Sequence, residues 1–192
     1  MKYDEYLRCA KKHLIGCQKL LQYYQLGPMS DYYVWLELYY LSGYIVEGIV
    51  VYSAYKLNNW DPNDDIQHDC NLAFSQRTNL DFYYKRQSKI VKGIETVDPF
   101  FQNRPSGALS VQGHKFQEIV KNLLRADPSF NNVPYIGNGL IDADIELLID
   151  KWNPDIRYRR SLSSLSRSMP VLNQDVISRL LTTCSIIYIN HV

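Results

Sequence analysis

The feature that most constrains the fold is a long apolar segment between about Asp31 and Asn58. Its larger side chains recur at steps of three and four, and they form two stripes on a helix: Trp35, Leu38, Ser42, Ile45, Ile49 and Tyr52 on one, and Tyr39, Val46 and Val50 on the other. A helix that is apolar on more than one side needs other elements to cover those sides. We therefore predict that this segment is the central helix of a bundle. Gly43 and Gly48 would let neighbouring helices approach it closely.

Four other segments have helical spacing. They are about Tyr3–Tyr24, the stretch from Gly113 to Asp127, Ile141–Trp152, and the segment after Pro170. The β-branched residues at 186–189 also permit a strand, but helix is favoured because the surrounding elements are helical. The prediction is an all-α, antiparallel up-and-down bundle of about five helices, forming one domain over residues 1–192. An irregular insertion is expected at about 76–111.

Composition narrows the classes of function. The 192-residue chain has a formal net charge of +1, so any binding to nucleic acid would need a local patch. Its four cysteines include no C-x-x-C pair. The acidic segment Asn58–Asp65 loosely suggests a calcium loop, but Ile66 and Leu72 stand where such a loop needs Gly and Glu. No metal or cofactor is therefore expected.

The start of the chain predicts a cytoplasmic protein. Its first residues, Met1–Glu5, lack the basic and apolar regions of a signal peptide. The most apolar stretch, Tyr44–Ala54, is interrupted by Glu47 and falls short of the roughly 20 residues that span a bilayer. No membrane association is expected.

Four short motifs occur in a fixed order. They are Tyr6–Leu14 in the first helix, Leu41–Gly48 in the second, Gly113–Phe116 at a later helix start, and Asp155–Tyr158 after the penultimate helix. Together they resemble the HEPN family over about residues 3–190. The resemblance implies a helical bundle, often a homodimer, that binds nucleotides or RNA. It also implies a nucleotidyltransferase partner, as in toxin–antitoxin pairs, and some members are metal-independent ribonucleases.

The ribonuclease motif of that family, Arg and His separated by four to six residues, is missing from its usual place. The last histidine, His191, is the only one after Arg157. Arg8 and His13 have the spacing, but five helical steps put their side chains roughly 140° apart. Val51 stands where the family often has Lys. The leading hypothesis is a non-catalytic module that self-associates and binds a nucleotide, RNA or a protein. The alternatives are a ribonuclease and a purely structural interaction module.

The best candidates for an anion site follow the fourth predicted helix. Arginine presents a planar fork that suits phosphate, and an interleaved tyrosine can stack on a base. The residues are Arg157, Tyr158, Arg159 and Arg160. The structural alternative is a solvated helix end whose arginines compensate nearby carboxylates.

Two further candidates each have a structural alternative. Glu47 lies in an apolar helix, where a carboxylate needs a partner. It could line a groove, or it could join two helices by pairing with a tyrosine, His114 or Arg157. His114 is expected in the first turn of its helix, where the helix dipole favours the neutral ring. It could contact a phosphate or act as a base, or it could pack at a helix junction.

Overall fold

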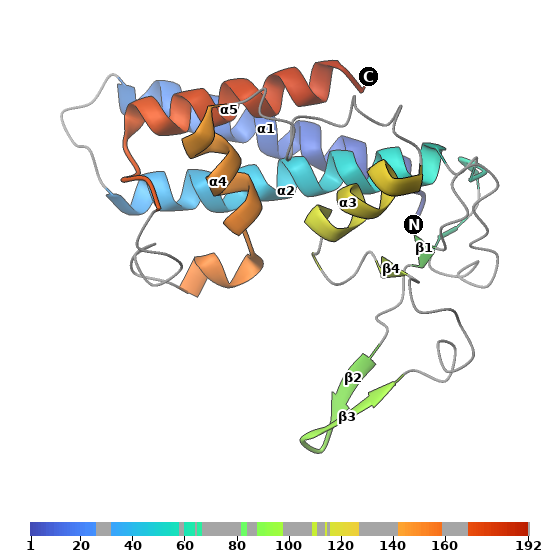
Figure 1. Ribbon diagram of the computed structural model, residues 1–192. Helices are drawn as coiled ribbons and strands as arrows, with labels where there is room; N and C mark the ends of the chain where they lie inside the picture. The colour runs from blue at the N-terminus through green and yellow to red at the C-terminus, as the bar shows by residue number, and fades with distance from the viewer. Residues whose placement is uncertain are drawn as a thin grey trace. The chain divides into compact units, whose positions relative to one another are not determined.

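The chain is mainly helical in the computed structural model. The structure describes residues 1–25, 32–57, 60–63, 65–66, 82–83, 88–97, 109–110, 114, 116–126, 142–158 and 169–191. They include five α-helices (Figure 1): α1 (Asp4–Gln25), α2 (Tyr32–Leu57), α3 (Phe116–Ala126), α4 (Ala143–Lys151) and α5 (Gln174–Ile189). The predicted helical class and the predicted helices are confirmed. The up-and-down order of the bundle stays a prediction.

The chain divides into two compact units. The first consists of residues 1–5 and 50–130, and the second of residues 6–49 and 131–192. Helix α2 contributes to both. The prediction of one domain over residues 1–192 stays a prediction.

The first unit holds α3 and all the described strands. Within the predicted irregular insertion, β2 (Ser88–Val91) pairs antiparallel with β3 (Ile94–Val97), and β1 (Phe82–Tyr83) pairs parallel with β4 (Leu109–Ser110). Lys92 and Gly93 connect β2 to β3 with φ values of 52° and 78°. Positive φ at both residues gives a two-residue turn whose twist matches that of paired strands.

The start of the chain is attached to the end of α2 in this unit. The ring of Tyr3 lies 5.6 Å from that of Tyr52 and 5.8 Å from that of Tyr55. The backbone N–H of Ile66 donates to the carbonyl oxygen of Met1 at 3.0 Å, and the Ile66 side chain is buried. The acidic segment Asn58–Asp65 is therefore followed by a buried apolar residue that is hydrogen-bonded to the start of the chain.

The second unit contains most of α1 and α2, and all of α4 and α5. Its buried residues on α1 are Ala10, Leu14 and Cys17, which follow the predicted stripe. The predicted close approach of a helix occurs at Gly48, whereas at Gly43 the close group is a side chain. A Cβ at Gly48 would lie 2.7 Å from the carbonyl oxygen of Tyr6 on α1, and a Cβ at Gly43 would overlap the ring of Trp152. Helix α2 can therefore be covered on several sides, as its apolar pattern requires.

Three hydrogen bonds donated by side chains join residues 39–42 of α2 to neighbouring elements. The Tyr39 hydroxyl donates to the Leu148 carbonyl oxygen at 2.8 Å. The Trp152 indole N–H donates to the Tyr40 carbonyl oxygen at 3.0 Å, and the Cys184 thiol donates to that of Ser42 at 3.9 Å. These contacts connect the end of α4 and the middle of α5 to α2.

Helices α4 and α5 each begin at a capping residue. The Asp142 carboxylate accepts the backbone N–H of Asp144 at 2.9 Å, and the Asn173 side-chain oxygen accepts that of Val176 at 2.9 Å. Such caps satisfy donors that have no partner within the helix. After α4 the chain forms a short 3-10 helix, Pro154–Tyr158. The C-terminal segment is helical through Ile189, as predicted.

Helix α2 has the length and composition of a membrane span. Its segment Tyr32–Lys56 is longer than the apolar stretch recognised in the sequence, and it meets both criteria for crossing a bilayer. However, 72% of its most apolar window is buried inside the protein, a pattern shared with the core helices of soluble proteins. The cytoplasmic location stays a prediction.

Candidate functional site

The second unit contains an aromatic cluster between α2 and the end of α4. The ring of Tyr44 lies 5.1 Å from that of Tyr40 and 5.1 Å from that of Trp152, both nearly perpendicular to it. The two tyrosine hydroxyls are 3.1 Å apart. Edge-to-face pairs of this kind add to the stabilisation that burial gives.

The sequence positions this cluster in a simple way. Residues four apart share one face of a helix, so Tyr40 and Tyr44 project together from α2. Trp152 follows α4 directly, and its ring packs against α2 where Gly43 has no side chain. The result is a half-buried wall that presents two phenol hydroxyls.

Arg157 and Tyr158 lie beside this wall on the 3-10 helix, and both are exposed. The guanidinium carbon of Arg157 is 4.5 Å from the centre of the Tyr158 ring. Hydrogen bonding to Tyr40, and to a smaller extent the contact with Tyr158, raises the pKa of Arg157 above its ordinary value. The site therefore carries a permanent positive charge next to an exposed aromatic ring.

Glu47 is buried one turn beyond Tyr44 on the same helix. The pKa of Tyr44 is raised, first by burial, then by its contact with Tyr40 and by the negative charge of Glu47, while Arg157 opposes the rise. The Tyr44 phenol is hence a neutral hydrogen-bonding group at ordinary pH. Because Tyr44 lies on the same helix as Glu47, this interaction does not join two helices, and both predicted roles of Glu47 stay predictions.

The alternative ribonuclease pair lies on α1. His13 is half-buried and its ring centre is 6.0 Å from that of Tyr44, whereas Arg8 is exposed. Helix α1 is continuous from Asp4 to Gln25, so the backbone does not bend these two side chains towards each other. Burial, and then the positive charge of Lys12, lowers the pKa of His13.

The remaining predicted site residues are His114, Arg159 and Arg160. His114 belongs to the first unit and precedes α3 by two residues, outside the predicted first turn. Its φ of 55° is left-handed and incompatible with the helix that follows. Arg159 and Arg160 lie outside the described residues.

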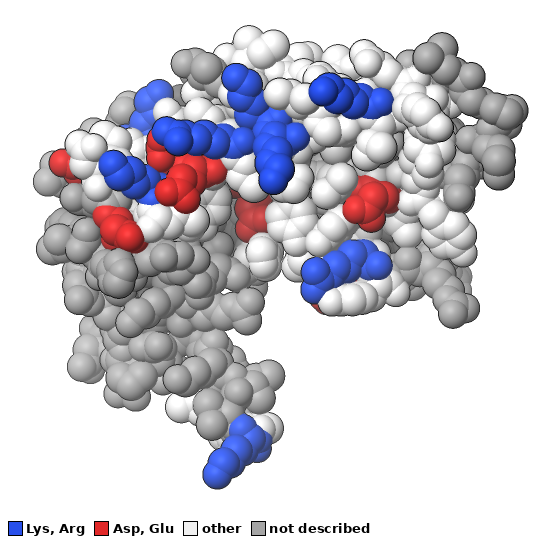
Figure 2. All heavy atoms as spheres, turned by 180° about the vertical axis from the view of Figure 1, so that it is seen from behind, with Lys and Arg blue, Asp and Glu red and all other residues white. Residues whose placement is uncertain are grey.

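Helix α1 carries four exposed cations that the sequence analysis did not single out as a group. They are Arg8, Lys11, Lys12 and Lys19. In Figure 2, Lys and Arg side chains gather over this helix. The signal was present in the sequence, since residues 6–25 contain no Asp or Glu.

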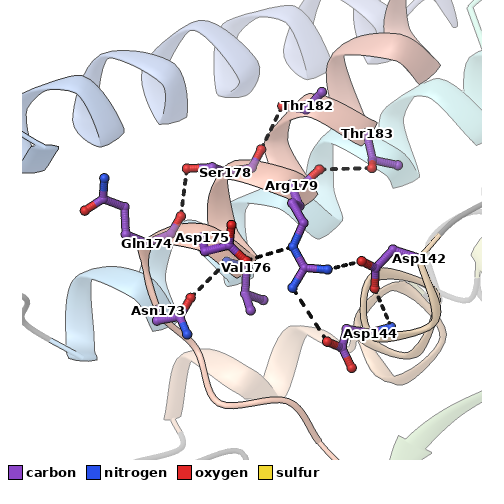
Figure 3. Close-up of polar contacts among 10 residues, drawn as sticks. All are labelled: Asp142, Asp144, Asn173, Gln174, Asp175, Val176, Ser178, Arg179, Thr182 and Thr183. Carbon is purple, nitrogen blue, oxygen red and sulfur yellow. Dashed lines mark hydrogen bonds and ion pairs between the residues drawn. The ribbon is translucent and has the colours of Figure 1, made fainter.

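Sequence reasoning also missed a cluster around Arg179 (Figure 3). Its guanidinium forms ion pairs with Asp142, with Asp144 at 3.6 Å and with Asp175 at 3.0 Å. The cluster connects the start of α4 to the first turns of α5, and its carboxylates are already paired with a cation. Among the described residues, no group of three or more His, Cys, Asp and Glu side chains is arranged to hold a metal ion.

The arrangement at Arg157 can bind an anion and stack on a planar ring. Comparison of the chain with protein-family models, with curated proteins and with solved structures found no match.

Proposed function

We propose that the helical bundle of the second unit is a non-catalytic binding module of the HEPN type, and that its ligand is a nucleotide or RNA. One observation carries the proposal: the exposed Arg157 guanidinium lies 4.5 Å from the exposed ring of Tyr158. The ordered HEPN-like motifs support the choice of ligand class, because they include these two residues.

The chemistry of the pair explains how such a ligand would bind. The Arg157 fork can donate two parallel hydrogen bonds to a phosphate, while the Tyr158 ring offers a face to a base. The contact between Tyr40 and Arg157 restricts the guanidinium. Less conformational freedom is then lost when the ligand binds.

The test is a titration of fluorescently labelled single-stranded RNA, together with calorimetry of UMP. Stacking of a base on an aromatic ring contributes about 1–3 kcal/mol, so Tyr158→Ala should weaken binding about 5- to 150-fold. Arg157→Gln should also weaken it, and Arg157→Lys should restore only part of the loss. Tyr33→Ala is the matched control, since Tyr33 is 63% exposed and Tyr158 73%. Equal affinity of the Tyr158 and Tyr33 variants would contradict the proposal.

The same RNA samples address the ribonuclease alternative. A non-catalytic module leaves the RNA intact after long incubation. Cleavage that His114→Ala or Arg157→Ala abolishes would replace the present proposal with a toxin-type enzyme.

A second candidate is a self-associating interaction module. Helices α1 and α5 lie side by side, where the Gln18 amide donates to the Ser185 hydroxyl at 3.1 Å. Nearby, three isoleucines are exposed: Ile15 by 43%, Ile186 by 44% and Ile189 by 70%. Such side chains suit a homodimer contact, which sedimentation would reveal and Ile186→Asp would weaken. The nucleotidyltransferase partner implied by the family resemblance stays a prediction.

A further inference from the structure

Helix α1 carries a run of exposed cations beyond its acidic first turn. Residues 6–25 include Arg8, Lys11, Lys12 and Lys19 but no acidic residue. All four side chains are exposed, and the described residues give Lys11, Lys12 and Lys19 no ion pair. On most protein surfaces, positive and negative side chains are interspersed. Four cations in a segment without an acidic residue are therefore unusual in a chain whose formal net charge is only +1.

The cations lie in one line. At about 100° per residue, Arg8, Lys12 and Lys19 fall within about 40° of one another around the helix. They point away from the buried Ala10, Leu14 and Cys17. At about 1.5 Å per residue the line extends for roughly 16 Å, which is long enough to contact several phosphates of an extended strand.

The helix that carries this line is connected to the Arg157 site through His13. Lys12 precedes His13, whose ring is 6.0 Å from that of Tyr44. The Tyr44 hydroxyl is 3.1 Å from that of Tyr40, and Tyr40 bonds to Arg157. Three consecutive side-chain contacts, all inside the second unit, thus lead from the candidate site to the basic line on α1.

We propose that Arg8, Lys12 and Lys19, flanked by Lys11, form a phosphate track, and that the ligand is a single strand of nucleic acid several nucleotides long rather than a free nucleotide. The inference rests on the proposed function, because it requires one nucleotide of that strand to occupy Arg157 and Tyr158. Counterions released from each contacted phosphate would supply much of the affinity.

The distribution of side chains on α1 favours nucleic acid over an anionic membrane. An interfacial helix buries apolar side chains at its outermost line and keeps its cations at the sides. Here Arg8, Lys12 and Lys19 make the outermost line mainly cationic, with Ile15 (43% exposed) as its one large apolar side chain, and Leu20 (39% exposed) lies to one side.

The experiment compares UMP with a labelled 12-nucleotide poly(U) strand at several salt concentrations. Each phosphate contact on a single strand contributes about 0.7 to the slope of log affinity against log salt. Lys12→Gln/Lys19→Gln should therefore lower that slope by about 1.4 and leave UMP binding unchanged. Between 0.05 and 0.2 M salt, the unaltered protein should then lose about sevenfold more affinity than the variant. The matched control, Lys56→Gln/Lys121→Gln, removes the same charge from two other exposed positions.

The outcomes separate the two proposals. If UMP binds through Tyr158 but the 12-mer binds no more tightly, or the α1 variant keeps the full salt slope, the phosphate track is overturned and the proposed function stands. If neither UMP nor the strand binds, both fall. The protein could instead bind vesicles rich in phosphatidylserine and not the strand. If Lys12→Gln/Lys19→Gln abolishes that vesicle binding, α1 is a membrane-binding surface and the phosphate track is overturned.

Discussion

The indole ring of Trp152 lies flat against α2 at Gly43, in space that any side chain at this position would occupy. Its N–H bonds to the Tyr40 carbonyl oxygen at 3.0 Å, which fixes the ring where it faces Tyr44. This one contact connects the packing of the bundle to the candidate site, because a displaced indole would also displace the wall behind Arg157.

Gly43→Ala should therefore destabilise the protein. Alanine is the better helix former by about 1 kcal/mol, but its methyl group would displace Trp152, and overpacking a core typically costs about 1–3 kcal/mol. The matched variant is Gly16→Ala on α1, where a Cβ meets nothing within 4 Å. It should stabilise the protein by about 0.5–1 kcal/mol. Urea unfolding measures both, and equal effects of the two substitutions would show that Trp152 does not restrict Gly43.

Asp142→Asn should lower the thermal midpoint near pH 7, and its effect should vanish in acid. The backbone N–H of Asp144, and then the Arg179 guanidinium, hold the pKa of Asp142 below its ordinary 3.8. A carboxyl whose pKa is lower in the folded state stabilises the fold above its ordinary pKa, and that contribution is lost as the pH falls through the lowered value. Asparagine keeps one oxygen that accepts the capping hydrogen bond, so the variant removes the charge and the oxygen that pairs with Arg179.

Thermal melts from neutral pH to about pH 2 measure this dependence. The control is Asp150→Asn, because the Asp150 carboxylate contacts the adjacent Lys151 at 2.9 Å on the same helix. If the thermal midpoint of the Asp142 variant were lower than that of the unaltered protein by the same amount at every pH, the cluster at Arg179 would not stabilise the fold through charge.

His13 should titrate below its ordinary pKa of 6.5. Burial, and then the charge of Lys12, disfavours the imidazolium in the folded protein. Just below pH 6.5 the unfolded chain therefore binds more protons than the folded protein does. The protein accordingly loses stability as the pH falls from 6.5 to the lowered pKa of His13. NMR titration of the ring gives the midpoint, and Lys12→Gln should move it up towards 6.5. A midpoint above 6.5 in the unaltered protein would be incompatible with the described environment.

Cysteine alkylation should distinguish the three described thiols. Burial, and then the negative charge of Glu37, raises the pKa of Cys17 to about 12, and Cys184 is fully buried. Cys9 is exposed. Since the thiolate is the reactive form, iodoacetamide at pH 8 should label Cys9 rapidly and the two buried thiols only after unfolding. Peptide mapping by mass spectrometry resolves each position, and rapid labelling of Cys17 in the native protein would show that α1 opens readily.

The helices could be predicted because each has a local signal. The apolar stripes of α1 and α2 appear in the sequence as apolar residues spaced three and four apart. Pro154 and Pro170 mark boundaries of the helices next to them. Arg157 and Tyr158 could be singled out because they are adjacent in the chain. By contrast, the pairing of Tyr44 with Trp152 joins residues more than one hundred positions apart, and no local pattern encodes such a contact. The turn at Lys92 was also missed, because lysine rarely adopts positive φ.

The hydrogen bonds donated by Tyr39, Trp152 and Cys184 restrict how the helices can be aligned in the native state. An interface made only of interchangeable aliphatic side chains can slide by one turn at little cost. Here such a slip would leave three buried polar donors without acceptors, and each orphaned group costs about 1–3 kcal/mol. These bonds therefore select one alignment of the helices over its neighbours, even though each of them adds little to the net stability.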